Sequence, residues 1–298
     1  EYLKNNQIYL DKYQIVQIYM AMGGIPHYLK EIKSGQSAIQ TIQEVCFSET
    51  GILQNEFSRL YTALFDNAER HIAIIRALAS KHKGIVRKEL VAISKLSSGG
   101  TFSTTLQELE QSGFISSYYP LENKKKEMLY RLTDEYSLFY LQFIENKRVG
   151  REDVWLRLSQ TQKYSPDSYR DWSGYAYENI CLKHITQIKK ALGISGIYSM
   201  TSSFYKKGDQ TEKGTQIDLL IDRNDHVINL CEIKFYNTTY SIDKAYAIAL
   251  REKMRIFQES TKTKKQLFWT IITTFGLKHN INSLGLIQHV LTLDDLFE

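Results

Sequence analysis

Three ionisable residues stand within two of the most apolar stretches of the chain. Asp218 lies in the run 216–222, and Glu232 and Lys234 lie in the run 227–235. Both runs have the composition of β-strands, and residues two apart in a strand share one face. Burying charged groups is costly unless they are paired or bind a metal ion. The pattern therefore predicts a functional cluster rather than an ordinary core.

A short polar segment separates the two runs, which predicts a β-hairpin. A four-residue turn pairs Asp222 with Val227 and places Asp218 opposite Cys231, one residue short of Glu232. A side chain can span that distance. Two carboxylates and an ammonium group are therefore expected to converge near one point.

Converging carboxylates suit a hard divalent cation. Mg²⁺ and Mn²⁺ prefer carboxylate, water and phosphate oxygens, and such an ion can hold an attacking water and neutralise charge on a scissile phosphate. Lys234 would then orient or activate the water, or stabilise the pentavalent intermediate. The alternative interpretation is a salt bridge at the rim of a sheet.

The pattern Asp218…Glu232-Ile-Lys234 resembles the signature of the PD-(D/E)xK nuclease superfamily, with Ile217 where a proline often stands. The resemblance implies a restriction-endonuclease-like α/β domain with an acidic residue on the first helix of its core. Glu178 occupies that place in the order. By the same resemblance, Glu178, Asp218 and Glu232 are the expected metal ligands, and these three residues with Lys234 form the catalytic set.

The helix expected after the second strand, at 241–259, carries basic residues that suggest a contact with nucleic acid. Lys244, Arg251 and Arg255 are spaced seven and four residues apart and so share one helix face. Such a face can contact a phosphate backbone. A solvated helix surface is the alternative, particularly for Arg255.

Between residues 67 and 150 the pattern predicts three helices and then a hairpin, the order of a winged helix-turn-helix. The helices are expected at 71–82, 87–94 and 101–112, and the strands at 114–121 and 128–132. The third helix, which enters the major groove in such domains, contains no Arg or Lys. The hairpin tip carries Lys124, Lys125 and Lys126, which could follow a phosphate backbone. A solvated tip and a packing or regulatory role for this domain are the alternatives.

The first 66 residues are predicted to be helical. A helix at 13–22 runs into Gly23-Gly24-Ile25-Pro26, where the glycines end one helix and the proline opens the next. No GxxxxGK[ST] motif occurs, so no phosphate-cradling loop is expected within this chain. Because the chain starts at Glu1, we interpret it as a fragment of a larger protein.

The segment 19–29 resembles the lid region of the archaeal/bacterial AAA-type ATPase family. In that family a P-loop domain precedes a winged helix, and many members end in a nuclease-like domain (the DUF234 type). Further segments fit the same pattern, namely 56–65, 84–87, 109–115 and 130–134. The resemblance implies that ATP binds only in the missing N-terminal domain, which would be a partner of this chain.

The expected fold class is α+β and multidomain. It comprises a helical lid-like segment at 1–66, a winged helix-turn-helix domain at 67–150, and a restriction-endonuclease-like domain with a mixed central sheet at 151–298. The helix near residues 134–146 carries an aromatic stripe, which we interpret as core rather than as a surface for stacking bases.

The composition is that of a folded protein, with 43% apolar and 24% charged residues and only three prolines. It excludes disordered and collagen-like chains. The longest apolar-leaning stretch, 267–277, is too short to span a bilayer, so no membrane partner is expected. Three scattered cysteines without a CxxC pair fit a reducing cytoplasm. The net charge of +5 permits a polyanionic partner without requiring one.

Two functions are compatible with these patterns. The first is metal-dependent hydrolysis of phosphodiester bonds in nucleic acid, with DNA the expected substrate and Mg²⁺ or Mn²⁺ the cofactor. The second is a catalytically silent nuclease-fold module for nucleic-acid binding or for assembly and regulation of the ATPase. A homo-oligomer is compatible with either function.

Overall fold

The computed structural model describes residues 1–81, 84–119, 121, 128–145, 154–159, 167–208 and 214–297. The chain separates into a first unit, Glu1–Ser117 with Met128–Ala176, and a second unit, Tyr118–Glu127 with Tyr177–Glu298. This division differs from the three segments expected from the sequence, because residues 1–66 share a unit with the helices that follow them. Across the described residues, no helix is both long and apolar enough to cross a membrane.

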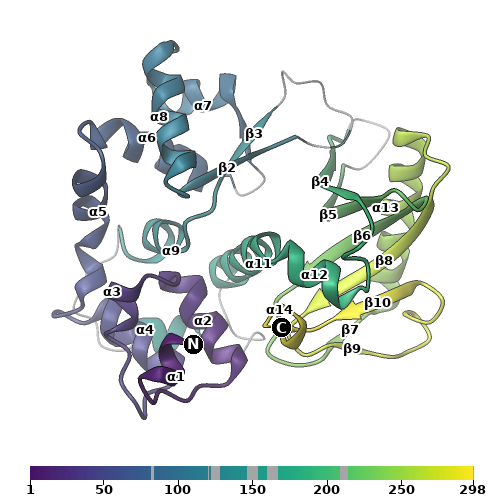
Figure 1. Cartoon of the computed structure of the whole chain (residues 1–298), viewed down its shortest axis with the longest axis horizontal. Coiled ribbons are helices and arrows are strands. Elements are labelled where there is room, and N and C mark those ends of the chain that lie inside the picture. The colour runs from purple at the N-terminus through teal and green to yellow at the C-terminus, as the bar shows by residue number, and fades with distance from the viewer. Residues whose placement is uncertain are drawn as a thin grey trace. The chain divides into compact units, whose positions relative to one another are not determined.

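The first unit begins with short helices, as the sequence predicts (Figure 1). They are α1 (Tyr2–Asn5), α2 (Lys12–Met22), α3 (Pro26–Leu29), α4 (Ala38–Phe47), the 3₁₀ turn η1 (Ile52–Gln54) and α5 (Glu56–Leu64). Gly23 ends α2 with a φ of 67°, a left-handed conformation that favours glycine. Pro26 opens α3. The predicted helix end and the predicted new start are both confirmed.

The middle of the first unit holds three helices and a small sheet. The elements are α6 (Ala68–Ala79), β1 (Ile85–Val86), α7 (Arg87–Ser94), α8 (Gly100–Gln111), β2 (Ile115–Tyr118) and β3 (Leu129–Leu132). The sheet order is β1-β3-β2, with β1 antiparallel to β3. The three predicted helices and two predicted strands are therefore present, and β1 is an addition. The lysines at 124–126 lie outside the described residues.

Aromatic side chains form a core around α9 (Glu135–Phe143), which follows this sheet in the sequence. The helix starts at Asp134, whose carboxylate accepts the backbone N–H of Ser137. Phe139 and Phe143 are fully buried and pack edge-on against Trp155 of α10 (Val154–Leu158). The interpretation of the aromatic stripe as core is confirmed.

The second unit is built on a mixed five-stranded sheet in the order β10-β8-β6-β5-β4. The strands are β4 (Ser199–Lys206), β5 (Thr215–Arg223), β6 (Val227–Lys234), β8 (Gln266–Thr273) and β10 (Ile287–Leu291). Strand β5 runs antiparallel to both β4 and β6, whereas β6, β8 and β10 are parallel to one another. The α+β class and the mixed central sheet are confirmed.

Helices and short strands complete this unit. They are the end of α11 (Asp167–Lys183), α12 (Ile185–Ala191), α13 (Lys244–Thr261), α14 (Leu293–Leu296), and the parallel pair β7 (Tyr240–Ser241) and β9 (Leu277–Lys278). The sequence suggested one helix across 172–190, but the structure has two, with His184 between α11 and α12.

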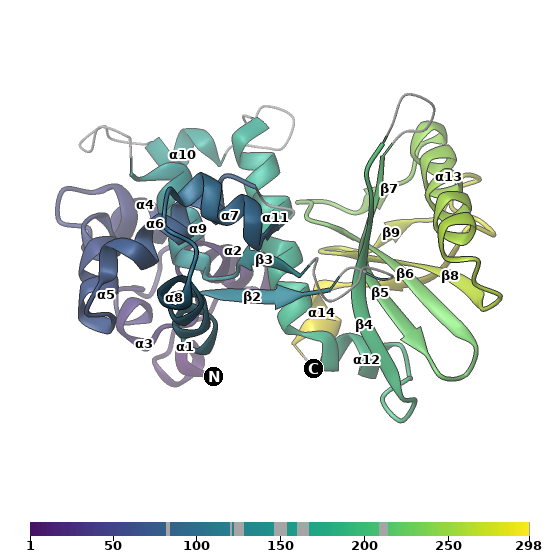
Figure 2. The ribbon, with the colours of Figure 1, turned by 90° about the horizontal axis from the view of Figure 1, so that it is seen from above.

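The helix α13 packs along one face of the sheet (Figure 2). Leu250 and Phe257 are fully buried in the same cluster as Leu230 of β6. Because side chains alternate along a strand, Glu232 and Lys234 point to this face with Leu230. The α13 helix therefore lies over the two motif residues of β6.

Replacing Leu250 with Ala is expected to destabilise the protein by about 2–5 kcal/mol, because Leu250 is 0% exposed and its loss leaves a cavity. The matched control is Ile248→Ala on the same helix, where the side chain is 56% exposed and the cost should stay below about 1 kcal/mol. Urea denaturation would measure both. Equal effects of the two variants would contradict the packing of α13 described above.

Candidate functional site

The hairpin of β5 and β6 has a register one residue away from the predicted one. Asp222 lies opposite Ile228, and Leu219 lies opposite Cys231. The prediction that Asp222 pairs with Val227 is therefore wrong. Strand β5 extends to Arg223 and β6 begins at Val227, which leaves three residues for the turn instead of four. The last of them, His226, adopts a left-handed φ of 63°, as is common in three-residue hairpin loops.

Asp218 sits at an irregularity in β5. Along β4, Ser202 and Phe204 pair with Leu220 and Ile217, so two steps on β4 match three steps on β5. Such a bulge re-aims the side chain at the extra residue and often ends pairing with the neighbouring strand. The ladder with β6 reaches only Leu219, and Oδ2 of Asp218 accepts the backbone N–H of Ile233 at 2.9 Å. The Asp218 carboxylate thus accepts the N–H of Ile233 where a carbonyl oxygen of β5 would otherwise do so, and this holds it beside Glu232.

Glu232 is completely buried and both of its carboxylate oxygens are engaged. Oε1 accepts the ammonium of Lys253 at 2.6 Å, and Oε2 accepts the hydroxyl of Tyr246 at 2.8 Å. The Lys234 ammonium lies 3.4 Å from Oε2 and 5.3 Å from the centroid of the Tyr246 ring. Two cations and one phenol therefore balance this buried carboxylate.

The electrostatics of Asp218 show that Glu178 belongs to the same cluster. Burial, together with the carboxylates of Glu232 and Glu178, raises the pKa of Asp218 to about 7, while Lys234 and the N–H of Ile233 act in the opposite direction. Asp218 therefore keeps its proton to a higher pH than an exposed carboxyl does. Hydrogen bonds and ion pairs connect Asp218, Glu232 and Lys234 along β5 and β6, and Glu178 acts on Asp218 through its charge.

Lys234 is held as a cation by its neighbours. Burial acts to lower the pKa of its ammonium, but Glu232 and Asp218 outweigh burial and hold that pKa above its ordinary value. Lys234 is therefore charged at neutral pH. In this setting it can stabilise negative charge or orient a water, but it cannot accept a proton as a free base.

Two residues of the cluster, Tyr246 and Lys253, were missed in the sequence. They are seven residues apart on α13, on the same stripe as Leu250, and that stripe faces the sheet. Lys244 and Arg251, the predicted nucleic-acid contacts, each stand two residues before them, about 200° around the helix. Both are exposed, on the side of α13 away from Glu232. Applying the seven-residue spacing to the buried stripe could have identified Lys253.

The donor set has the chemistry that a hard cation requires, although no preformed cage is present. Within the described parts of the chain, no group of three or more His, Cys, Asp or Glu residues is arranged to hold a metal ion. The carboxyl groups of Glu178, Asp218 and Glu232 nevertheless supply oxygen donors whose charges act on one another. They fit Mg²⁺ or Mn²⁺ by ligand type, and the occupied oxygens of Glu232 would have to be freed.

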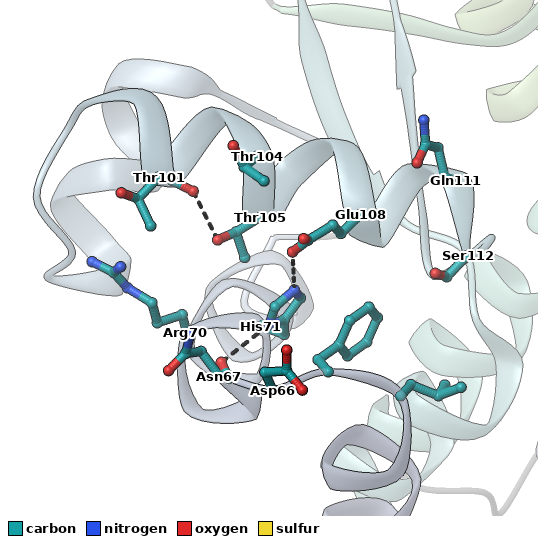
Figure 3. A pocket seen from close by; sticks show the side chains of 12 residues that line it. Asp66, Asn67, Arg70, His71, Thr101, Thr104, Thr105, Glu108, Gln111 and Ser112 are labelled. Atoms are coloured by element: carbon teal, nitrogen blue, oxygen red, sulfur yellow. Dashed lines mark hydrogen bonds and ion pairs between the residues drawn. The ribbon is translucent and has the colours of Figure 1, made fainter.

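A separate cavity of about 440 Å³ lies in the first unit, between α8 and the segment joining α5 to α6 (Figure 3). The buried His71 bridges this region: Nε2 is 2.8 Å from Oε2 of Glu108, and Nδ1 is 3.1 Å from the carbonyl oxygen of Asn67. Its ring stacks on Phe65 with centroids 3.9 Å apart. His71 therefore fixes α8 to α6.

The cavity is bordered by polar residues of α8. Thr101, Thr104, Glu108 and Gln111 line it, and Thr101, Thr104 and Gln111 are also exposed to solvent. Arg131, a basic residue next to the wing in sequence, is buried, with its guanidinium carbon 4.9 Å from the centroid of the Tyr175 ring. Neither α8 nor Arg131 supplies a free cation to a phosphate backbone.

Comparisons with known proteins identify no family. No family model matches the chain, and no curated protein matches it. A search of solved structures finds the crystal structure of protein VC1899 from Vibrio cholerae, with a TM-score of 0.27 and 13% sequence identity. The alignment covers 87% of this chain and 57% of that one, so the chain spans little more than half the length of that structure. A TM-score of this size does not establish a shared fold.

We expect Asp218→Asn to stabilise the protein progressively as the pH rises from about 4 to about 7, measured by urea denaturation in EDTA. The folded pKa of Asp218, about 7, exceeds its ordinary 3.8. Between these values the unfolded state has lost the proton that the folded state keeps, so the wild type loses stability as the pH rises. The Asn variant has no proton to lose.

Asp225→Asn is the control for this experiment and should show the opposite sign. The exposed Asp225 pairs with Arg223, which holds the pKa of that carboxyl below its ordinary value. Any stability it contributes is present above that ordinary value and is lost as the pH falls. A pH-independent difference between Asp218→Asn and the wild type would contradict the raised pKa of Asp218.

Proposed function

We propose that the second unit is a PD-(D/E)xK-type nuclease domain that hydrolyses phosphodiester bonds in nucleic acid, with DNA as the favoured substrate. The observation that carries the proposal is the convergence of Asp218, Glu232 and Lys234, with Glu178 close enough to raise the pKa of Asp218. The order of elements supports it. Glu178 lies on α11, which together with α12 precedes three antiparallel strands; Asp218 lies on the second strand, and Glu232 and Lys234 lie on the third.

Each residue of the cluster has a defined part in this proposal. Glu178, Asp218 and Glu232 would hold Mg²⁺ or Mn²⁺, which supplies a nucleophilic water and neutralises charge on the phosphate. The Lys234 ammonium, kept charged by Glu232 and Asp218, stabilises negative charge on the phosphate oxygens and orients the water. The bulge at Asp218 and the ladder of β6 fix the carboxylates relative to the ammonium.

A second candidate function is a catalytically silent module with the same fold. The observation that favours it is the saturation of Glu232, whose two oxygens already bind Lys253, Tyr246 and Lys234. A salt-bridge cluster of this kind can serve structure alone. The unit would then bind nucleic acid or take part in assembly and regulation of an ATPase.

The role of the first unit is also proposed by resemblance. Its helices, followed by the order α6-β1-α7-α8-β2-β3, agree with a lid-like segment joined to a winged helix, as in AAA-type ATPases with a DUF234-type nuclease-like domain. The turn at Gly23-Gly24 favours glycine, because a Cβ on Gly24 would lie 3.1 Å from the ring of Tyr19. ATP would bind in a P-loop domain outside this chain, and that domain is the proposed partner.

Asp218→Ala and Lys234→Ala are each expected to lower nucleic-acid cleavage by about 100-fold or more, since each removes a group that acts on the reacting phosphate or its ion. The measurement is cleavage of plasmid DNA, single-stranded DNA and RNA in Mg²⁺ or Mn²⁺. The matched control is Asp222→Ala on the same strand, which loses its ion pair with Lys265 but does not contact Glu232. That variant should keep wild-type activity.

Metal titration by calorimetry separates the two candidate functions. If the wild type cleaves no substrate, binds no Mn²⁺, and Asp218→Ala binds nucleic acid as the wild type does, the silent module is the correct assignment. Cleavage that survives Asp218→Ala would place the activity outside this cluster.

A further inference from the structure

Lys253 contacts Glu232 more closely than the motif lysine does. Its ammonium is 2.6 Å from Oε1, whereas that of Lys234 is 3.4 Å from Oε2. The Glu232 side chain is 1% exposed and that of Lys253 is 23% exposed. The pair therefore joins a buried carboxylate to a side chain that still reaches solvent.

The surrounding packing holds this ion pair in place. Leu250 and Phe257, on the same stripe of α13 as Lys253, are fully buried against the sheet. Tyr246, two turns before Lys253, donates to the second oxygen of Glu232 at 2.8 Å. The backbone of α13 is thus anchored, and any departure of the ammonium must come from rotation of the Lys253 side chain.

An ammonium and a divalent cation compete for the same carboxylate oxygen. Mg²⁺ binds carboxylate oxygens at about 2.0–2.1 Å, so an ion on Oε1 of Glu232 would lie in repulsive contact with the Lys253 ammonium. Like charges at such a distance in a poorly solvated site repel strongly. The stem of Lys253 is long, and its exposed end gives the ammonium a route to water.

We infer that Lys253 is a built-in competitor of the divalent cation, and that its ammonium must leave Glu232 before this carboxylate can serve as a ligand. Lys253 then sets the metal affinity of the site and keeps Glu232 neutralised when no ion is bound. The inference rests on the proposed metal-dependent function and adds a positioning residue that regulates loading of the site.

The test is calorimetric titration of the full 298-residue chain with MnCl₂ at pH 8, comparing the wild type with Lys253→Met. Methionine keeps the apolar stem and removes the charge. We expect the variant to bind Mn²⁺ about 5–150-fold more tightly, the range typical of coupled sites. Lys265→Met is the matched control, because Lys265 also pairs with a carboxylate, that of Asp222 at 2.5 Å, and its side chain is 31% exposed. Its affinity for Mn²⁺ should equal that of the wild type.

Thermal unfolding gives a second readout that does not depend on activity. In EDTA, Lys253→Met should unfold at a lower temperature than the wild type, because Glu232 loses a buried partner, and Mn²⁺ should raise its Tm by more than it raises that of the wild type. Should the Met variant fail to fold, Lys253→Gln, which keeps a hydrogen-bond donor without the charge, serves the same comparison.

The outcomes distinguish this inference from the proposed function. Tighter binding by the variant, including binding where the wild type shows none, supports the competition. Equal or weaker binding by a folded variant overturns the competition and leaves the metal site standing. Absence of Mn²⁺ binding in the wild type and in every Lys253 variant overturns the metal site itself and the competition with it.

Discussion

The buried carboxylate of Glu232 determines which side chains must surround it in the second unit. An ionised carboxylate without water is stable only when positive or hydrogen-bonding partners surround it, and removing one such partner typically costs about 3–5 kcal/mol. Here the partners come from two elements: Lys234 follows Glu232 on β6, and Tyr246 and Lys253 project from α13. The apolar contacts of α13 with the sheet therefore do more than exclude water, because they deliver the cation and the hydroxyl that make the buried charge tolerable.

The same charge balance constrains how the protein could meet nucleic acid. The cluster carries the carboxyl groups of Glu178, Asp218 and Glu232, and these repel a phosphate unless an ion or a freed ammonium offsets their charge. Helix α8 of the first unit offers little help, because it contains neither Arg nor Lys and its polar residues line a cavity of their own. Exposed cations such as Lys244 and Arg251 remain available on α13, on the side away from the cluster. One face of α13, with Lys244 and Arg251, would thus attract a polyanion, and the opposite face, with Tyr246 and Lys253, would support the site that acts on it.

Much of the fold could be predicted from local pattern, and the failures have physical causes. Alternating apolar runs located β5, β6 and β8, and the Gly-Gly-Ile-Pro segment located the end of α2 because glycine and proline have strong backbone preferences. The register of the hairpin could not be predicted, because it depends on whether His226 adopts a left-handed conformation. Lys253 was missed because a basic residue on a helix is usually solvated, and only the packing of α13 shows which stripe faces the sheet. The convergence of Asp218 and Glu232 was expected, but the bulge between β4 and β5 at Asp218 was not.

The bulge at Asp218 affects how the sequence around this site could change during evolution. The number of residues between Asp218 and Glu232 is not itself under chemical constraint, since a turn can lengthen without moving either strand. The face of the sheet to which Asp218 points is constrained. Deleting the one surplus residue of β5 would restore a regular ladder with β4. The Asp218 side chain would then turn towards the opposite face of the sheet. Distant descendants could therefore retain the arrangement of groups while losing any fixed interval between them, and a signature defined by spacing would overlook them.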